Sequence, residues 1–208
     1  HNYGWAIIVM TLILKGVFLP ITHAGSKQMK KMQAIAPKQK AIQERYKKDP
    51  QKAQREIMEL YKRNRVNPMA GCLPMLIQMP IFIALFHLLP EAIELKGAPF
   101  MAWIQDLSAP DRLVAFPFTI PLLGWDALNL LPLVMTVSQY WHQKLMPQAG
   151  ASPEQAKIMA FMPIMFGFIC YNMPSGLVLY WFMQNLFSIF HQVFINRIVI
   201  ALHHEDQE

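Results

Sequence analysis

The stretch Trp5–Thr22, "WAIIVMTLILKGVFLPIT", decides the fold class, because it is almost entirely apolar and carries one charged residue, Lys15. As an α-helix it is near the length that crosses a hydrocarbon core about 30 Å thick. Lys15 would then lie about 15 Å along the helix from Trp5, close to the middle of that core. A lysine that faces lipid at this depth is costly. We therefore expect Lys15 to snorkel to the aqueous surface, to find a polar partner or to line a wet cavity.

The rest of the chain repeats this apolar composition. Of its 208 residues, 54% are hydrophobic and only 15% are charged, which argues against a soluble protein. Five segments are near the length that a membrane-spanning helix needs. We therefore predict an all-α, polytopic membrane protein with five transmembrane helices, forming a single domain over residues 1–208. The predicted helices are 5–22, 69–89, 127–144, 153–171 and 175–201, followed by a tail at 202–208.

The charges predict how this protein lies in the membrane. Between Lys27 and Arg65 there are 13 basic and 4 acidic residues, a net charge of +9. The positive-inside rule keeps such a segment in the cytoplasm. The chain therefore begins outside the membrane, residues 90–126 form an external connection, and the tail 202–208 is cytoplasmic.

The basic segment 27–65 also has helical periodicity. Its apolar residues recur at helical spacing on both sides of Asp49 and Pro50, which supply a helix cap and a first-turn proline. We predict a cytoplasmic helical hairpin whose basic surface either fixes topology and touches anionic lipid headgroups, or also docks a ribosome or nascent chain. Sequence-specific nucleic-acid binding is disfavoured, because aromatic residues are sparse here. The basic residues that we single out are Lys38, Lys40, Arg45, Lys47 and Lys48.

The external connection 90–126 contains two apolar stretches. In "APFMAWIQDL", residues 98–107, the spacing of Phe100, Trp103, Ile104 and Leu107 predicts an external amphipathic helix that lies on the membrane. In "RLVAFPFTIPLLGWDALN", residues 112–129, the prolines interrupt any long helix. We expect a separate segment at the membrane interface, in which Asp126 caps the following helix.

Catalytic and metal-binding motifs are absent from the sequence. It contains no HExxH, GxSxG, P-loop or GxGxxG motif, and its two cysteines form no CxxC pair. We therefore predict no enzyme activity, cofactor or metal. The few polar residues within the apolar segments either join helices or line a wet cavity. A small-molecule transporter or channel is the alternative function, but a lone lysine without partner carboxylates argues against ion coupling.

Six stretches of the sequence together resemble one family, the YidC/Oxa/Alb membrane protein insertases, and most closely the core shared by its bacterial members. They cover nearly the whole chain and occur in the family's order, which makes the resemblance far more specific than a single motif. The stretches are "NYGWAIIVMTLILKGVFLPIT", "NPMAGCLPMLIQMPIFIALF", "APFMAWIQDLSAPD", "LLPLVMTVSQYWHQKLMP", "KIMAFMPIMF" and "PSGLVLYWFMQN".

The resemblance implies a five-helix core in the bacterial inner membrane that inserts hydrophobic segments of newly made client proteins. Family members work without nucleotide or cofactor, alone or beside the Sec translocon. Gram-negative members carry another helix and a large periplasmic domain ahead of this core. We therefore expect the present chain to be such a core after truncation.

The resemblance also implies a site. A hydrophilic groove, open to the cytoplasm, holds one positive residue, which matches Lys15, and an apolar slide lets the client pass into lipid. The alternatives are a structural lysine that snorkels and side chains that serve ordinary helix packing. The implied groove residues are Lys15, Thr11, Gln78 and Gln184, and the implied slide residues are Met79, Phe82, Tyr180 and Trp181.

The sequence departs from the family at two places. The positive groove residue is usually arginine, and lysine keeps the charge but lacks the planar fork of donors and can lose its proton when buried. The external segment from about Arg112 to Asn129 is longer than the loop expected in the family. This second departure affects the external cap and leaves the core unchanged.

Overall fold

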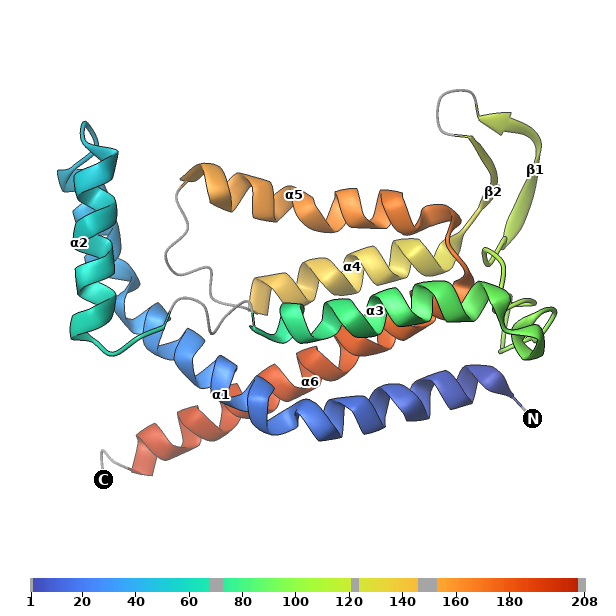
Figure 1. Ribbon diagram of the computed structural model, residues 1–208, viewed down its shortest axis with the longest axis horizontal. Coiled ribbons are helices and arrows are strands. Elements are labelled where there is room, and N and C mark those ends of the chain that lie inside the picture. Colours follow the sequence, from blue (N-terminus) through green and yellow to red (C-terminus); the bar gives the residue numbers. More distant parts are fainter. Residues whose placement is uncertain (1, 68–72, 121–123, 146–152, 206–208) are drawn as a thin grey trace.

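The computed structural model describes residues 2–67, 73–120, 124–145 and 153–205, and it is mostly helical (Figure 1). Predicted boundaries at 68–72 and 146–152 lie outside the described residues. The helices are α1 (Tyr3–Arg45), α2 (Pro50–Arg63), α3 (Leu73–Glu91), α4 (Leu130–Leu145), α5 (Pro153–Ile169) and α6 (Ser175–Glu205), with short 3-10 helices η2 (Ile93–Leu95) and η3 (Cys170–Asn172) and two strands, β1 (Val114–Ile120) and β2 (Trp125–Leu128).

Helix α1 joins two elements that the sequence predicts as separate. It runs without a break from the apolar stretch 5–22 into the basic segment, with Pro20 and Pro37 inside it. The predicted end at residue 22 is therefore wrong, because a proline can bend a helix without ending it when neighbouring groups satisfy the freed carbonyl. Figure 1 shows α1 changing direction before it reaches α2. Within the described residues, α1 is the one helix with the length and apolar composition to cross a membrane, and Leu76–Leu89 and Lys157–Asn172 are shorter apolar helices.

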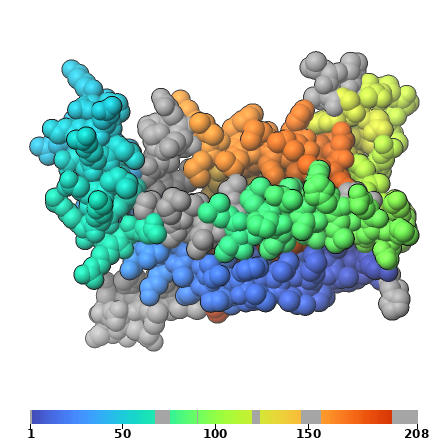
Figure 2. Space-filling view, viewed as in Figure 1, coloured from blue at the N-terminus to red at the C-terminus, as the bar shows by residue number. Residues whose placement is uncertain are grey.

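Helix α6 lies at the centre of the bundle, where it packs against α1, α3 and α4. Its residues Leu177 to Tyr180 meet the apolar side chains of the other helices. Gly167 allows α5 to approach α4 closely, because a Cβ at this position would overlap the Thr136 side chain. Figure 2 shows α1, α3 and α5 side by side on one face of the molecule. The core residues are Ile7, Leu85, Leu89, Leu95, Ile104, Leu107, Leu131, Met135, Cys170, Leu177, Val178, Leu179 and Tyr180.

A second, smaller core joins α2 to the end of α1. Met32 and Ile35 of α1 pack with Ile57 and Tyr61 of α2. Asp49 begins α2 by accepting a hydrogen bond from the Lys52 backbone N–H at 3.0 Å, ahead of Pro50 at the first helical position. The basic segment thus forms two helices that pack through their apolar faces.

The external amphipathic helix predicted from residues 98–107 does not form. The backbone N–H of Phe100 donates to the Ile104 carbonyl, and that of Leu107 donates to the Ala98 carbonyl, so this segment folds into turns. Leu107 is 0% exposed and Ile104 is buried in the bundle core. The apolar spacing was read as a face for the membrane, but tertiary packing uses these side chains to close the end of the bundle.

The connection to α4 also differs from the prediction. Strands β1 and β2 pair in an antiparallel hairpin, with a register shift between Ala115 and Ile120. Asp126 lies in β2 and accepts a hydrogen bond from Arg112 at 2.9 Å, so it does not cap α4. Asp111 serves that helix instead, accepting from the Leu131 backbone N–H at 2.9 Å. The predicted tail also changes, since α6 continues to Glu205.

Candidate functional site

Lys15 of α1 points into the helix bundle and contacts α6. Its ammonium Nζ donates a hydrogen bond to Ser188 Oγ at 2.7 Å. Ser188 Oγ in turn donates to the Gln184 carbonyl at 2.8 Å, within its own helix. In the described part of the chain, no carboxylate forms an ion pair with Lys15. The lysine therefore has a polar partner, and no carboxylate among the described residues neutralises its charge.

The Lys15 contact is deep in the bundle and nearer to its basic end. Ser188 lies about 20 Å along α6 from its start, and Lys15 about 18 Å along α1, at about 1.5 Å per residue. Both helices start at the end of the bundle that carries the β-hairpin, opposite α2 (Figure 1). Measured from the starts of these helices, the contact therefore lies slightly past the middle of a length of about 30 Å, toward α2.

Helix α6 presents a row of polar side chains to α1 and α3. Tyr180, Gln184 and Ser188 are each one turn apart, which places them on one face of the helix. The Tyr180 hydroxyl accepts hydrogen bonds from Gln78 Nε2 of α3 at 2.6 Å and from Gln184 Nε2 at 2.9 Å. The Gln184 Oε1 atom is buried without a hydrogen-bond partner in the structure. We call these four residues together with Lys15 the polar row.

The polar row brings together three of the four residues predicted for the groove. Lys15, Gln78 and Gln184 belong to one chain of contacts that joins α1, α3 and α6. Thr11 is fully buried one turn before Lys15, but its hydroxyl donates to the Ile7 carbonyl of its own helix at 2.7 Å. Thr11 therefore lies near the row, and its hydroxyl is bonded within α1.

The predicted slide residues divide into two groups. Phe82 of α3 meets Trp181 of α6 edge-on, with ring centroids 5.1 Å apart, and Met79 is exposed beside them. Trp181 also donates from Nε1 to Gln139 Oε1 of α4 at 3.1 Å. Tyr180, in contrast, is 0% exposed. The prediction that Tyr180 lies on a lipid-facing surface is therefore wrong. Its side chain is inside the bundle, where its hydroxyl accepts hydrogen bonds from two members of the polar row.

Sequence reasoning left Ser188 out of the predicted site. By residue type, Ser188 is simply a polar residue in an apolar segment. Its spacing from Tyr180 and Gln184, which places all three on one helix face, could have indicated that it belongs to the site. Asn185 lies on another face and donates to Ser138 Oγ of α4 at 3.0 Å, joining the two helices.

A histidine from each of α1 and α6 also meets between these two helices. The rings of His23 and His191 lie edge-on, with centroids 6.1 Å apart.

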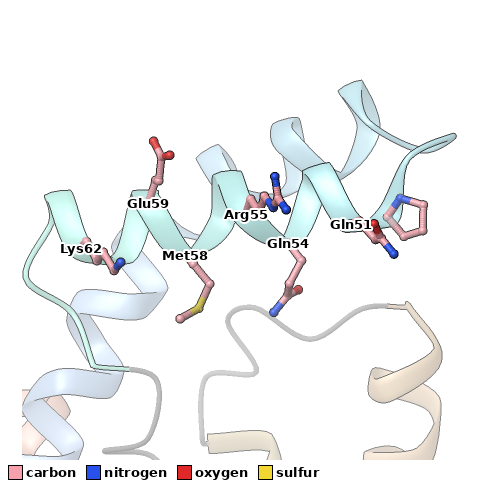
Figure 3. Close-up of a pocket in the computed structure, with 7 residues that line it drawn as sticks. Gln51, Gln54, Arg55, Met58, Glu59 and Lys62 are labelled. Atoms are coloured by element: carbon pink, nitrogen blue, oxygen red, sulfur yellow. The ribbon is translucent and has the colours of Figure 1, made fainter.

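The basic helices carry an exposed polar surface. Along α2, a shallow hollow is lined by mixed charges and amides, and Figure 3 shows Gln54 and Met58 pointing to one side of the helix and Glu59 to another. Glu59 pairs with Arg63 at 3.2 Å on the helix surface. The basic residues singled out from the sequence, Lys38, Lys40, Arg45, Lys47 and Lys48, are all exposed.

Replacing Tyr180 by phenylalanine should destabilise the bundle. Tyr180→Phe removes the oxygen that accepts from Gln78 and Gln184, and a buried unsatisfied donor costs about 1–3 kcal/mol. We expect a lower midpoint of thermal unfolding in detergent. Tyr140→Phe is the matched control, because Tyr140 is exposed on α4 and should change stability little. Equal unfolding midpoints for both variants would mean that water can accept the hydrogen bonds of Gln78 and Gln184 when the Tyr180 hydroxyl is removed.

These features define a mostly helical protein in which a lysine of a long apolar helix meets a row of polar side chains on a neighbouring helix. The comparisons with known proteins agree with this class. The sequence profile of the family described as "60Kd inner membrane protein" matches residues 1–202. The chain therefore belongs to this inner membrane protein family, and the family resemblance of the six stretches is confirmed.

Curated relatives named "Membrane protein insertase YidC" are similar to nearly the whole chain. Those from Wolinella succinogenes, Syntrophobacter fumaroxidans and Campylobacter jejuni are 47%, 48% and 45% identical, over 96%, 95% and 98% of this chain. The matches cover 34%, 35% and 36% of those relatives, so the chain spans about a third of their length. A structure titled "Active YidC insertase crystal structure with the first transmembrane domain resolved" matches with a TM-score of 0.69 and 31% identity, over 90% of this chain and 40% of that one.

Proposed function

We propose that this chain is the core of a membrane protein insertase and chaperone, which passes hydrophobic segments of client proteins from the cytoplasm into the bilayer. The observation that carries the proposal is the Lys15 side chain, which points into the bundle with Ser188 as its partner and no described carboxylate beside it. Membership in a family whose relatives are named insertases supports it. An enzyme activity and a cofactor are not part of the proposal.

The chain acts in the bacterial inner membrane as a five-helix bundle. The first part of α1 and helices α3, α4, α5 and α6 cross the bilayer. The basic surface of α2 and the end of α1 stays in the cytoplasm, so the start of this chain lies outside and its end lies inside. The polar row then faces a groove that opens toward the cytoplasm.

The groove lowers the barrier to insertion without supplying energy. A client's polar tail must leave water before its apolar segment can enter lipid, and desolvating that tail is costly. The amides of Gln78 and Gln184 offer hydrogen bonds part-way across, and the Lys15 charge attracts carboxylates of the tail. Burial of the client's own apolar helix in lipid drives the process forward. The chain thus acts by stabilising an intermediate position that lipid alone does not stabilise.

The client leaves the groove along α3 and α6. Met79, Phe82 and Trp181 form an apolar path beside the polar row. Methionine and aromatic side chains give broad, adaptable contact without selecting one sequence. Ordinary helix packing would use the same side chains, so a path for clients requires that substitutions there reduce insertion more than stability.

The partners of this site are newly made membrane proteins and the bilayer itself. The five exposed basic residues of the α1–α2 turn region attract anionic headgroups at about 1 kcal/mol each near the surface. The same surface can hold a ribosome or a nascent chain, and the Sec translocon is a further partner in the membrane. A salt-dependent association of this chain with ribosomes would favour the ribosome over lipid alone.

The proposal is tested by insertion of a small single-span client into liposomes that contain this chain. We expect protease-protected client with the chain and little with empty liposomes. A flux measurement on the same liposomes tests the alternative, a small-molecule transporter or channel. Flux without client insertion would overturn the proposal, and insertion without flux would exclude the alternative.

A further inference from the structure

The β1–β2 hairpin exposes an apolar surface that the proposed insertion site does not use. The sequence from Leu113 to Trp125 contains no charged residue. Val114 is 52% exposed and Phe118 is 63% exposed, and the rings of Phe116 and Phe118 stack with centroids 6.1 Å apart. A two-stranded hairpin is marginally stable in water by itself. The exposed apolar side chains of this hairpin therefore need to be shielded from water by another surface.

The charges of the hairpin lie together at its base. Arg112 and Asp126 pair at 2.9 Å beside the start of α4, and both side chains are about half exposed. The apolar strand surface extends away from this pair. The hairpin is thus divided into a polar base and an apolar body, which is the pattern of an element that enters a membrane interface from one side.

Aromatic contacts fix the body of the hairpin to α5 and to η3, which follows it. The ring of Trp125 stacks on Tyr171 with centroids 3.8 Å apart and lies 5.7 Å from the ring of Phe168. Phe168 and Phe161 are exposed on the outer face of α5. Figures 1 and 2 show the hairpin at the end of α5 that is distant from α2. Its apolar surface therefore continues the outer surface of a membrane helix.

The edge of β1 is poorly suited to pair with another strand. Pro117 lacks a backbone N–H, and the register shifts between Ala115 and Ile120. Both features blunt an open strand edge. The uncharged body also offers nothing for electrostatic attraction of a soluble partner. Aromatic and aliphatic side chains next to a membrane helix instead fit the boundary between headgroups and acyl chains.

We propose that the β1–β2 hairpin is a membrane anchor, with Phe116, Phe118 and Trp125 in the interface of the leaflet opposite the basic helices. This inference rests on the membrane placement in the proposed function. It gives the interfacial position expected for this segment from the sequence to the paired strands β1 and β2. The Arg112–Asp126 pair then remains at the headgroup level and holds the hairpin at its depth.

Photo-crosslinking to lipid tests the anchor. A benzophenone amino acid replaces Phe118, Phe161 or Glu94 in separate variants of the full chain, each reconstituted in phosphatidylethanolamine and phosphatidylglycerol vesicles that contain a clickable phospholipid. Phe161 is the positive control on α5, and Glu94 is an exposed polar control in η2 on the hairpin's side of the bundle. We expect several-fold more lipid adduct at 118 than at 94, close to the level at 161.

The three positions separate the two proposals. Suppose that position 161 forms lipid adduct but position 118 forms no more adduct than position 94. This result would overturn the anchor and leave the membrane placement intact. A protein adduct at 118, to a second copy of this chain, would overturn it in favour of an association surface. Absence of lipid adduct at both 118 and 161 would overturn the membrane placement itself.

Discussion

Lys15→Ala is expected to reduce insertion of a single-span client into liposomes at least about tenfold, the equivalent of roughly 1.4 kcal/mol in the barrier, whereas Lys15→Arg retains activity. The reason is that the Lys15 ammonium is the lone charge of the polar row, with Ser188 as its hydrogen-bond partner. Alanine removes both the charge and the donor. Arginine keeps the charge and can still donate to Ser188.

Two further variants separate the charge from packing and from position. Lys15→Met keeps a long apolar side chain without charge, so it should lose activity as alanine does. Ser188→Ala keeps the charge but removes its partner, so it should cost less than either. Equal insertion by Lys15, alanine, methionine and arginine variants would make the lysine a structural residue and would move the proposed mechanism to the path formed by Met79, Phe82 and Trp181.

Asp111→Ala is expected to give the largest loss of stability, about 2–4 kcal/mol, because it leaves two donors in the closed end of the bundle without an acceptor. The buried Asp111 carboxylate accepts from Trp103 Nε1 at 2.7 Å and from the Leu131 backbone N–H at 2.9 Å. It thus ties the turn segment 98–113 to the start of α4. Fluorescence-monitored thermal unfolding in detergent would report the loss.

The hairpin offers a matched control for this prediction. Asp126 is also an aspartate of the connection 90–126, but its side chain is about half exposed and its ion pair with Arg112 lies at the surface, so Asp126→Ala should cost at most about 1 kcal/mol. Asp111→Asn keeps an acceptor oxygen and should lie between the two. If Asp111→Ala were as mild as Asp126→Ala, water would have to reach Trp103 and Leu131, and the end of the bundle would not be closed.

The helical elements could be predicted because apolar runs of bilayer length have few alternatives. The errors arose where an apolar pattern has two uses. In residues 98–107, the spacing showed that one face is apolar, but not that Leu107 would be buried under α6 rather than in lipid. Likewise, Pro20 could either end a helix or bend it, and only the packing of α1 against α6 decides.

The site could be predicted in part for the same reason. Lys15 was singled out as a charge within an apolar run, and Gln78 was assigned to the groove from the family resemblance. The structure brings both side chains into one row. Tyr180 has both an apolar ring and a hydroxyl, so its residue type fits a slide and a polar cluster equally well. The hydrogen bonds that Gln78 and Gln184 donate to its hydroxyl assign Tyr180 to the polar cluster. Ser188 needed the three-dimensional contact with Lys15.

The continuity of α1 has a mechanical consequence. One helix carries Lys15 in its apolar half and Met32 and Ile35, which hold α2, in its basic half. Pro20 lies between these halves, where the freed carbonyl makes bending easiest. A load on α2 would therefore act through a lever whose pivot is Pro20, and tilting its long arm would shift the Lys15 ammonium against α6. The position of α2 and the position of the Lys15 ammonium are thus linked through one continuous helix rather than through a flexible loop.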